Sequence, residues 1–181
     1  MEKPTITKNI KMPSKQRIPQ GVVNLINKQI QRELESSHLY WAIYTWLNFN
    51  GYLNSAEVYK KYAEEERSHA DKFIDYLLDK DVKPIFPATS MPSTDKFVDL
   101  VDVLNASYEH ECQVTDWLNE ICCEANETED YTTLKFMDWF MKEQIEEEAK
   151  FKNLLDVWKV LGKSENKGLA LIELDEMVGE N

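Results

Sequence analysis

Glu66 and His69 have the clearest capacity for metal chemistry, because they lie three residues apart in a segment of helical character. That spacing places the carboxylate and the imidazole on nearly the same face of a helix. Three other segments with a helical repeat of apolar side chains are each interrupted near the midpoint, by Glu33, by Glu111, and by Gln144 with Glu147. If the four segments pack side by side, these six side chains meet at one depth in the core.

A buried cluster of four carboxylates needs positive charge, since burying one unpaired carboxylate costs several kcal/mol. No Lys or Arg occupies a position on the inward faces that the spacing predicts, which favours metal cations as the partners. Oxygen ligands with one imidazole suit iron or manganese, and two ions about 4 Å apart can share a bridging carboxylate. The pattern approximates a di-iron site, except that Gln144-Ile-Glu-Glu147 departs from a second Glu-x-x-His.

Four long helices and a short fifth helix must position these residues. The apolar repeat and the scarcity of Gly and Pro predict helices at 20–48, 53–79, 95–126, 130–161 and 168–178. The fold class is therefore all-α. In the third helix, the spacing predicts an inward face made of Phe97, Val101, Leu104, Tyr108, Glu111, Thr115, Leu118 and Cys122.

The segment between the second and third helices is too rich in proline to be helical, with Pro84, Pro87 and Pro92. Its fifteen residues, 80–94, can span up to about 50 Å when extended. A helix of ~27 residues is about 40 Å long. The linker can thus run the full height of a four-helix bundle, which makes the second and third helices parallel through one long crossover.

The charge of the chain is strongly acidic, with a net value of -12 over 181 residues. Such a protein is expected to repel nucleic acid and anionic membranes and to attract cations, although acidic residues also serve solubility alone. The odd number of cysteines (Cys112, Cys122 and Cys123), without a C-x-x-C motif, predicts reduced thiols. With no membrane-spanning stretch and no secretory signal, a cytoplasmic location is expected.

Beyond these patterns, the chain resembles bacterial non-haem ferritins over residues 18–177. The stretches that carry the resemblance are Glu33-Leu-Glu-Ser-Ser-His-Leu-Tyr40, Glu64-Glu-Glu-Arg-Ser-His69, Tyr108-Glu-His-Glu111 and Trp139-Phe-Met-Lys-Glu-Gln-Ile-Glu-Glu-Glu148. The resemblance implies a ferritin-like di-iron domain over 18–181. It also implies a ferroxidase that oxidises Fe(II) with O2 or H2O2 and stores ferric mineral inside a homo-oligomeric cage of twenty-four subunits.

The resemblance further implies which residues hold iron. The first ion would be held by Glu33, Glu66 and His69, and the second by Glu66, Glu111 and Glu147, with Gln144 close by. Tyr40 matches a tyrosine that supplies an electron during oxidation. A third iron site is implied at Glu65, Glu143, Glu146 and Glu147, although an acidic run such as this is also typical of a solvated helix face. Trp139 matches a tryptophan near the centre, and core filling explains it equally well.

Related families set the alternatives. A haem-containing bacterioferritin would carry a second Glu-x-x-His, and it would have methionine where Arg67 stands, so no haem is expected. A rubrerythrin-like peroxidase would also want that second motif and a cysteine-rich iron domain. A DNA-binding miniferritin would place its metal site between subunits, which the ligands within this bundle disfavour.

Residues 1–17 extend beyond the matched region. They contain five basic residues, one acidic residue and two prolines, which predicts a flexible tail. An organelle-targeting segment is the alternative, although such segments are typically richer in arginine.

Overall fold

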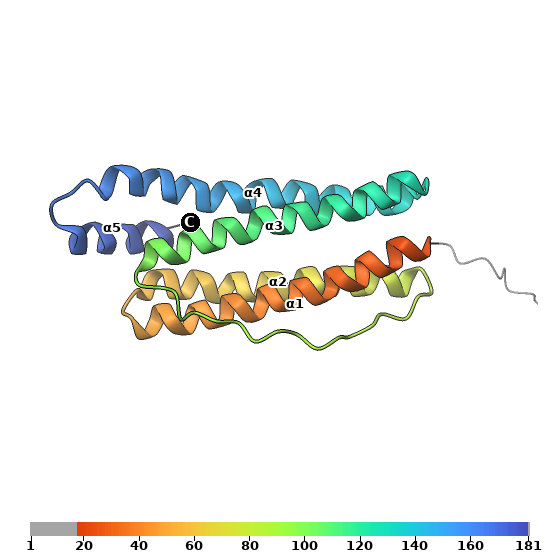
Figure 1. Cartoon of the computed structure of the whole chain (residues 1–181), viewed down its shortest axis with the longest axis horizontal. Helices are drawn as coiled ribbons and strands as arrows, with labels where there is room; N and C mark the ends of the chain where they lie inside the picture. The colour runs from red at the N-terminus through yellow and green to blue at the C-terminus, as the bar shows by residue number, and fades with distance from the viewer. Residues whose placement is uncertain (1–17, 181) are drawn as a thin grey trace, which may run out of the picture.

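The computed structural model describes residues 18–180, which form five helices and no strand. The helices are α1 (Gln20–Phe49), α2 (Leu53–Asp79), α3 (Leu100–Glu127), α4 (Tyr131–Leu161) and α5 (Lys167–Gly179). Figure 1 shows α1 and α2 as one antiparallel pair, with α3 and α4 stacked against it as a second pair. The predicted all-α bundle with a short fifth helix is confirmed, whereas the predicted tail at 1–17 lies outside the described residues.

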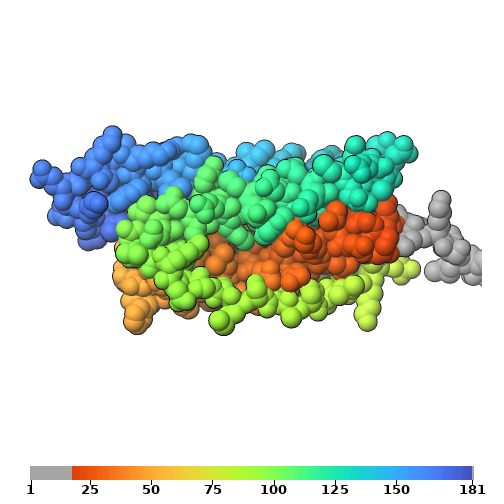
Figure 2. Space-filling view, viewed as in Figure 1, coloured from red at the N-terminus to blue at the C-terminus, as the bar shows by residue number. Residues whose placement is uncertain are grey.

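The connection between α2 and α3, residues 80–99, runs along the whole length of the bundle beside α1 (Figures 1 and 2). Side chains of α1 hold it in place. The backbone N–H of Ile85 donates to Asn27 at 2.7 Å, and the backbone N–H of Ser90 donates to Glu35 at 2.8 Å. Because this connection returns to the end where α2 began, α2 and α3 run in the same direction, as the predicted crossover requires.

The start of α3 was predicted too early, at residue 95, and the helix begins at Leu100. Asp99 explains the difference, since its carboxylate accepts hydrogen bonds from the backbone N–H groups of Val101 and Asp102 at 2.8 and 3.3 Å. An aspartate in this position satisfies N–H groups that lack a partner within the helix. The residues just before it form a turn, in which Phe97 donates to the carbonyl of Thr94 at 3.1 Å.

The predicted inward face of α3 is also partly wrong. Val101, Tyr108, Thr115 and Cys122 are only half-buried. The helix is rotated relative to the predicted face, because its buried residues are Leu100, Val103, Leu104, Ser107, Glu111, Val114, Leu118, Ile121 and Ala125. Glu111 belongs to both the predicted and the observed inward face, so its predicted burial is confirmed.

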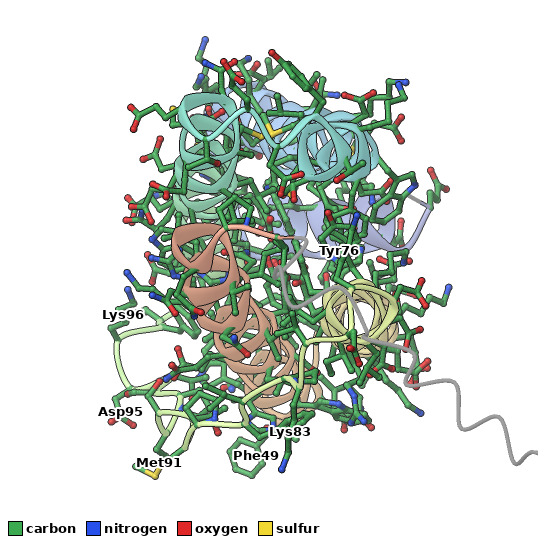
Figure 3. All side chains as sticks on the ribbon, turned by 90° about the vertical axis from the view of Figure 1, so that its right-hand side faces the viewer. Phe49, Tyr76, Lys83, Met91, Asp95 and Lys96 are labelled. Carbon is green, nitrogen blue, oxygen red and sulfur yellow. The ribbon has the colours of Figure 1, made fainter. Side chains whose placement is uncertain are left out.

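The core consists of two apolar clusters, and each of the four long helices contributes to both. The first cluster includes Ile30, Phe73, Val114 and Phe140, and the second includes Tyr40, Tyr59, Ala63, Leu104 and Phe151. Figure 3, which looks along the bundle, shows side chains filling the space between the four helices. Along each helix the two clusters are separated by a short polar stretch, so the core is interrupted at a common level.

The fifth helix packs against the beginning of α2. The carboxylate of Asp175 accepts hydrogen bonds from the backbone N–H of Ser55 at 2.9 Å and from the side chain of Asn54 at 3.0 Å. Leu174 and Val178 are buried against the bundle. Among the described helices, none combines the length and the apolar character needed to cross a membrane.

Candidate metal centre

Six polar side chains occupy the level between the two apolar clusters, and we call them the polar layer. Every one of them is at most 9% exposed. They come from all four long helices. The members are Glu33 from α1, Glu66 and His69 from α2, Glu111 from α3, and Gln144 and Glu147 from α4. The helical repeat turns these positions inward together with their apolar neighbours, which is why residues so far apart in sequence share one level.

Glu33, Glu66 and His69 bring metal-binding atoms together, with one candidate ligand atom from each lying within 4.8 Å of the others. The imidazole Nδ1 of His69 is 3.9 Å from Glu33 Oε2 and 3.7 Å from Glu66 Oε2. Gln29 donates to the other oxygen of Glu33 at 2.8 Å. Within the described part of the chain, Glu66 Oε2 is buried without a hydrogen-bond partner. A buried oxygen in this state is suited to a cation.

Glu111 is held by its neighbours on both carboxylate oxygens. The phenol of Tyr40 donates to Oε1. The side-chain amide of Gln144 donates to Oε2 at 2.8 Å and to the backbone carbonyl of Glu111 at 3.0 Å. Gln144 therefore orients Glu111 in this structure, and Tyr40 reaches the polar layer through the same carboxylate.

Glu147 contacts a positive charge that the inward-facing repeat does not reveal. The ammonium of Lys150 lies 2.7 Å from Glu147 Oε1 and 5.4 Å from the centre of the Tyr62 ring. Its side chain is only 32% exposed. Lys150 is a residue of the site that the sequence interpretation missed, although its spacing of three residues from Glu147 was the available signal.

Burial is the main reason that the acids of the polar layer resist ionisation. It raises the pKa of Glu33 and of Glu66 well above the usual range, and nearby carboxylates add to the effect. Burial likewise raises the pKa of Glu111 despite the hydrogen bonds from Tyr40 and Gln144, and the pKa of Glu147 despite Lys150. Several buried carboxyl groups therefore lack enough nearby positive charge to stabilise their ionised forms. Divalent cations would supply that charge.

The sequence matches a family model described as a ferritin-like domain over residues 23–160. The chain belongs to the ferritin family. A bacterial non-heme ferritin of Campylobacter jejuni is 34% identical over 152 residues, covering 84% of this chain and 90% of the relative. A probable bacterial non-heme ferritin-like protein of Haemophilus influenzae is 33% identical over 158 residues, covering 87% and 94%. These relatives confirm the non-haem bacterial resemblance drawn from the sequence motifs.

Solved structures agree with this family assignment. An open pore ferritin from the archaeon Archaeoglobus fulgidus superposes with a TM-score of 0.84 at 26% identity. The match covers 91% of this ferritin chain and 99% of the archaeal chain. The four-helix bundle, the crossover and the short fifth helix are therefore those of a ferritin subunit.

Trp139 does not fill the core, because it is 40% exposed. Its ring meets His69 edge to face, with the ring centres 5.4 Å apart. The ammonium of Lys72 lies 4.3 Å from the centre of the same indole. Trp139 therefore covers the outer side of the imidazole, which leaves the opposite side of His69 toward the glutamates.

The acids predicted for a third iron site lie farther out than the polar layer. Glu65 and Glu146 are exposed and Glu143 is half-buried, whereas Glu147 is buried. Among residues 18–180, the group with three converging metal-binding side chains is that of Glu33, Glu66 and His69. A third iron site at the outer acids remains a prediction.

Proposed function

We propose that this ferritin oxidises Fe(II) at a two-iron centre in the polar layer and stores the ferric product as a mineral inside a closed shell of subunits. The observation that carries the proposal is Glu66, whose buried Oε2 has no hydrogen-bond partner among the described residues. It lies next to His69 and Glu33. A buried carboxylate surrounded by other carboxylates is stable in its charged form only when cations join it.

The proposed ligands are those that the resemblance to bacterial non-haem ferritins implies, and the geometry of the polar layer supports them. Glu33, Glu66 and His69 would hold one substrate ion, because their ligand atoms already converge. Glu66, Glu111 and Glu147 would hold the other, with Glu66 bridging. The charges of Glu111 and Glu147 both act on Glu66, which supports this second set. His69 would serve a single ion, since a neutral imidazole offers one nitrogen at a time.

The proposed reaction balances with two Fe(II) ions per turnover. Each iron loses one electron, and O2 accepts the two electrons with two protons to become H2O2. When H2O2 is the oxidant, two electrons and two protons convert it to two molecules of water. Anionic oxygen ligands favour Fe(III) over Fe(II), because they compensate the higher charge better.

The test is dioxygen consumption after Fe(II) is added to the metal-free protein, followed together with absorbance in a rapid-mixing instrument. Native protein should oxidise Fe(II) rapidly, and Glu66→Ala should be impaired more than His69→Ala, since the bridge serves both ions. Glu57→Ala, an exposed glutamate on the same helix, is the matched control and should behave as native protein. If Glu66→Ala oxidised Fe(II) as fast as native protein, the polar layer would not be the ferroxidase centre.

Storage requires assembly, and several exposed apolar side chains support subunit contacts. Figure 3 shows Phe49 and Met91 pointing away from the bundle, and they are 90% and 91% exposed. Leu169 and Ile172 are exposed on α5. Contacts between subunits would remove these side chains from water. By family resemblance we propose a cage of twenty-four subunits. Light scattering measures the size of the assembly, and finding only monomers or dimers would contradict the proposed storage role.

The proposed location is the cytoplasm. Cys112, Cys122 and Cys123 are free within the described part of the chain, which is compatible with a reducing compartment. Fractionation of cells followed by immunodetection tests this proposal, and recovery of the protein from a secreted or membrane fraction would contradict it.

A further inference from the structure

Lys150 lies in a position that the proposed iron chemistry does not use. Along α4, Glu143, Glu147 and Lys150 are spaced four and three residues apart, which puts them on one face of the helix. The facing residues belong to α2, where Tyr62 lies under the ammonium and Glu65 is one turn farther along. The side chain of Lys150 therefore bridges two helices at the edge of the polar layer.

The ion pair of Lys150 differs from the other lysine ion pairs of the described residues. In those pairs the carboxylate is Asp138 or Asp156, whose side chains are 51% and 42% exposed. The Glu147 side chain is only 8% exposed. Besides Glu147, the carboxylates of Glu65 and Glu143 also act on the ammonium. Lys150 is thus ion-paired with Glu147, a proposed iron ligand, and lies near enough to Glu65 and Glu143 for their charges to act on it.

We infer that the ammonium of Lys150 occupies the place of a third metal ion at Glu65, Glu143 and Glu147, and so limits each subunit to the two ions of the polar layer. The inference rests on the proposed function for the identity of those two ions. A protonated amine has no lone pair with which to bind a metal. A divalent ion on the same carboxylates would face a like charge at short range, and it would compete for an oxygen of Glu147 that is already paired.

The predicted third iron site is then a latent site in the native protein. Its acids are present, but Lys150 is already paired with Glu147, and its charge acts on Glu65 and Glu143 as well. Because the ammonium pairs with Glu147 from the outer side, it can fix the orientation of that carboxylate without binding either iron. Lys150 then acts as a residue that determines how many ions bind.

The experiment counts Zn²⁺ ions bound per subunit by the metal-free, assembled full-length protein, using equilibrium dialysis at physiological salt. Zn²⁺ is divalent and redox-inert, so oxidation cannot change the count. Lys150→Met keeps the length of the side chain and removes its charge, while Lys150→Arg keeps a charge. Lys152→Met is the matched control, because Lys152 lies two residues after Lys150 on the same helix and pairs with Asp156, whose side chain is 42% exposed.

Native protein, Lys150→Arg and Lys152→Met should each bind two Zn²⁺ per subunit, and Lys150→Met should bind three. Adding Glu143→Ala to Lys150→Met should return the count to two. If Lys150→Met does not assemble, Lys150→Gln takes its place with the same expectation.

Three ions on native protein, or an unchanged count in the uncharged variants, would overturn the inference and leave the two-iron centre standing. A third ion that binds to Lys150→Arg, or that persists after Glu143→Ala is added, would also overturn it. Fewer than two ions on native protein would overturn the proposed function and this inference together.

Discussion

Tyr40 on α1 donates its phenol hydrogen to the carboxylate of Glu111 on α3, so the tyrosine is joined directly to a proposed iron ligand. Tyr40 is 1% exposed and packs edge to face against Tyr59, with ring centres 5.6 Å apart. The phenol is therefore fixed in position by packing before any metal binds. Tyr40 is close enough to the centre to influence it without being a ligand.

Replacing Tyr40 by Phe should slow Fe(II) oxidation by roughly tenfold or more, because hydrogen bonds to charged groups are worth about 1.5–3 kcal/mol. Zn²⁺ stoichiometry should not change, since no ligand is removed. Stopped-flow absorbance after Fe(II) addition measures the rate. Tyr59→Phe is the matched control, because it loses a buried hydrogen bond to Ser107 that touches no acid of the polar layer. Equal rates in both variants would contradict a role for the Tyr40 contact.

Replacing Gln144 by Leu should destabilise the metal-free protein by about 1–3 kcal/mol, because Glu111 loses both hydrogen bonds from the amide. The side chain is 6% exposed, so water cannot readily replace the missing donor. Denaturant unfolding followed by circular dichroism measures the change. An unfolding midpoint equal to that of native protein would show that Gln144 does not support Glu111.

Replacing Glu66 by Gln should stabilise the metal-free protein, because it removes the acid whose pKa is raised by burial and by neighbouring carboxylates. The substitution keeps the volume of the side chain, so cavity formation does not obscure the result. Melting curves with and without Zn²⁺ provide the measurement. Native protein should gain about 2.7 kcal/mol at a ligand concentration one hundred times the dissociation constant, and the variant should gain much less. Equal metal-induced shifts would exclude Glu66 as a ligand.

Replacing Asp130 by Ala should cost about 1 kcal/mol, since its carboxylate accepts a hydrogen bond from the backbone N–H of Thr133 at the start of α4, at 3.1 Å. Partial burial acts to raise the pKa of Asp130, but hydrogen bonds from Thr133 and Thr132 hold it below its usual 3.8.

The lowered pKa of Asp130 gives this contribution a pH dependence. A carboxyl group whose pKa is lower in the folded state stabilises the protein above the unfolded pKa and loses that effect as pH falls through the folded pKa. The difference in stability between native protein and Asp130→Ala should thus be full at neutral pH and shrink below 3.8. Denaturant midpoints measured across this range test it, and a difference that stayed constant would contradict the charged cap.

The amino-acid sequence was sufficient to predict the helices and most of the residues of the polar layer. Glu33, Glu66, Glu111 and Glu147 could be found because each interrupts an apolar repeat near the middle of a helix, and burial of an acid is too costly to be accidental. The long linker predicted the parallel arrangement of α2 and α3, since chain length and proline content limit how the segment can run. These features depend on local periodicity and on chain geometry.

The packing of the helices against one another sets how α3 is rotated, what Gln144 binds and where Lys150 reaches. The repeat defines an inward face only to within about one residue step, and the packing of α3 against α1 and α4 selected Ser107 over Tyr108 for the core. The reach of a long side chain depends on which helix faces it, so the contact of Lys150 with Tyr62 had no signature in either segment alone. Side-chain partners between helices far apart in sequence are fixed by packing, which the periodicity of a single helix does not encode.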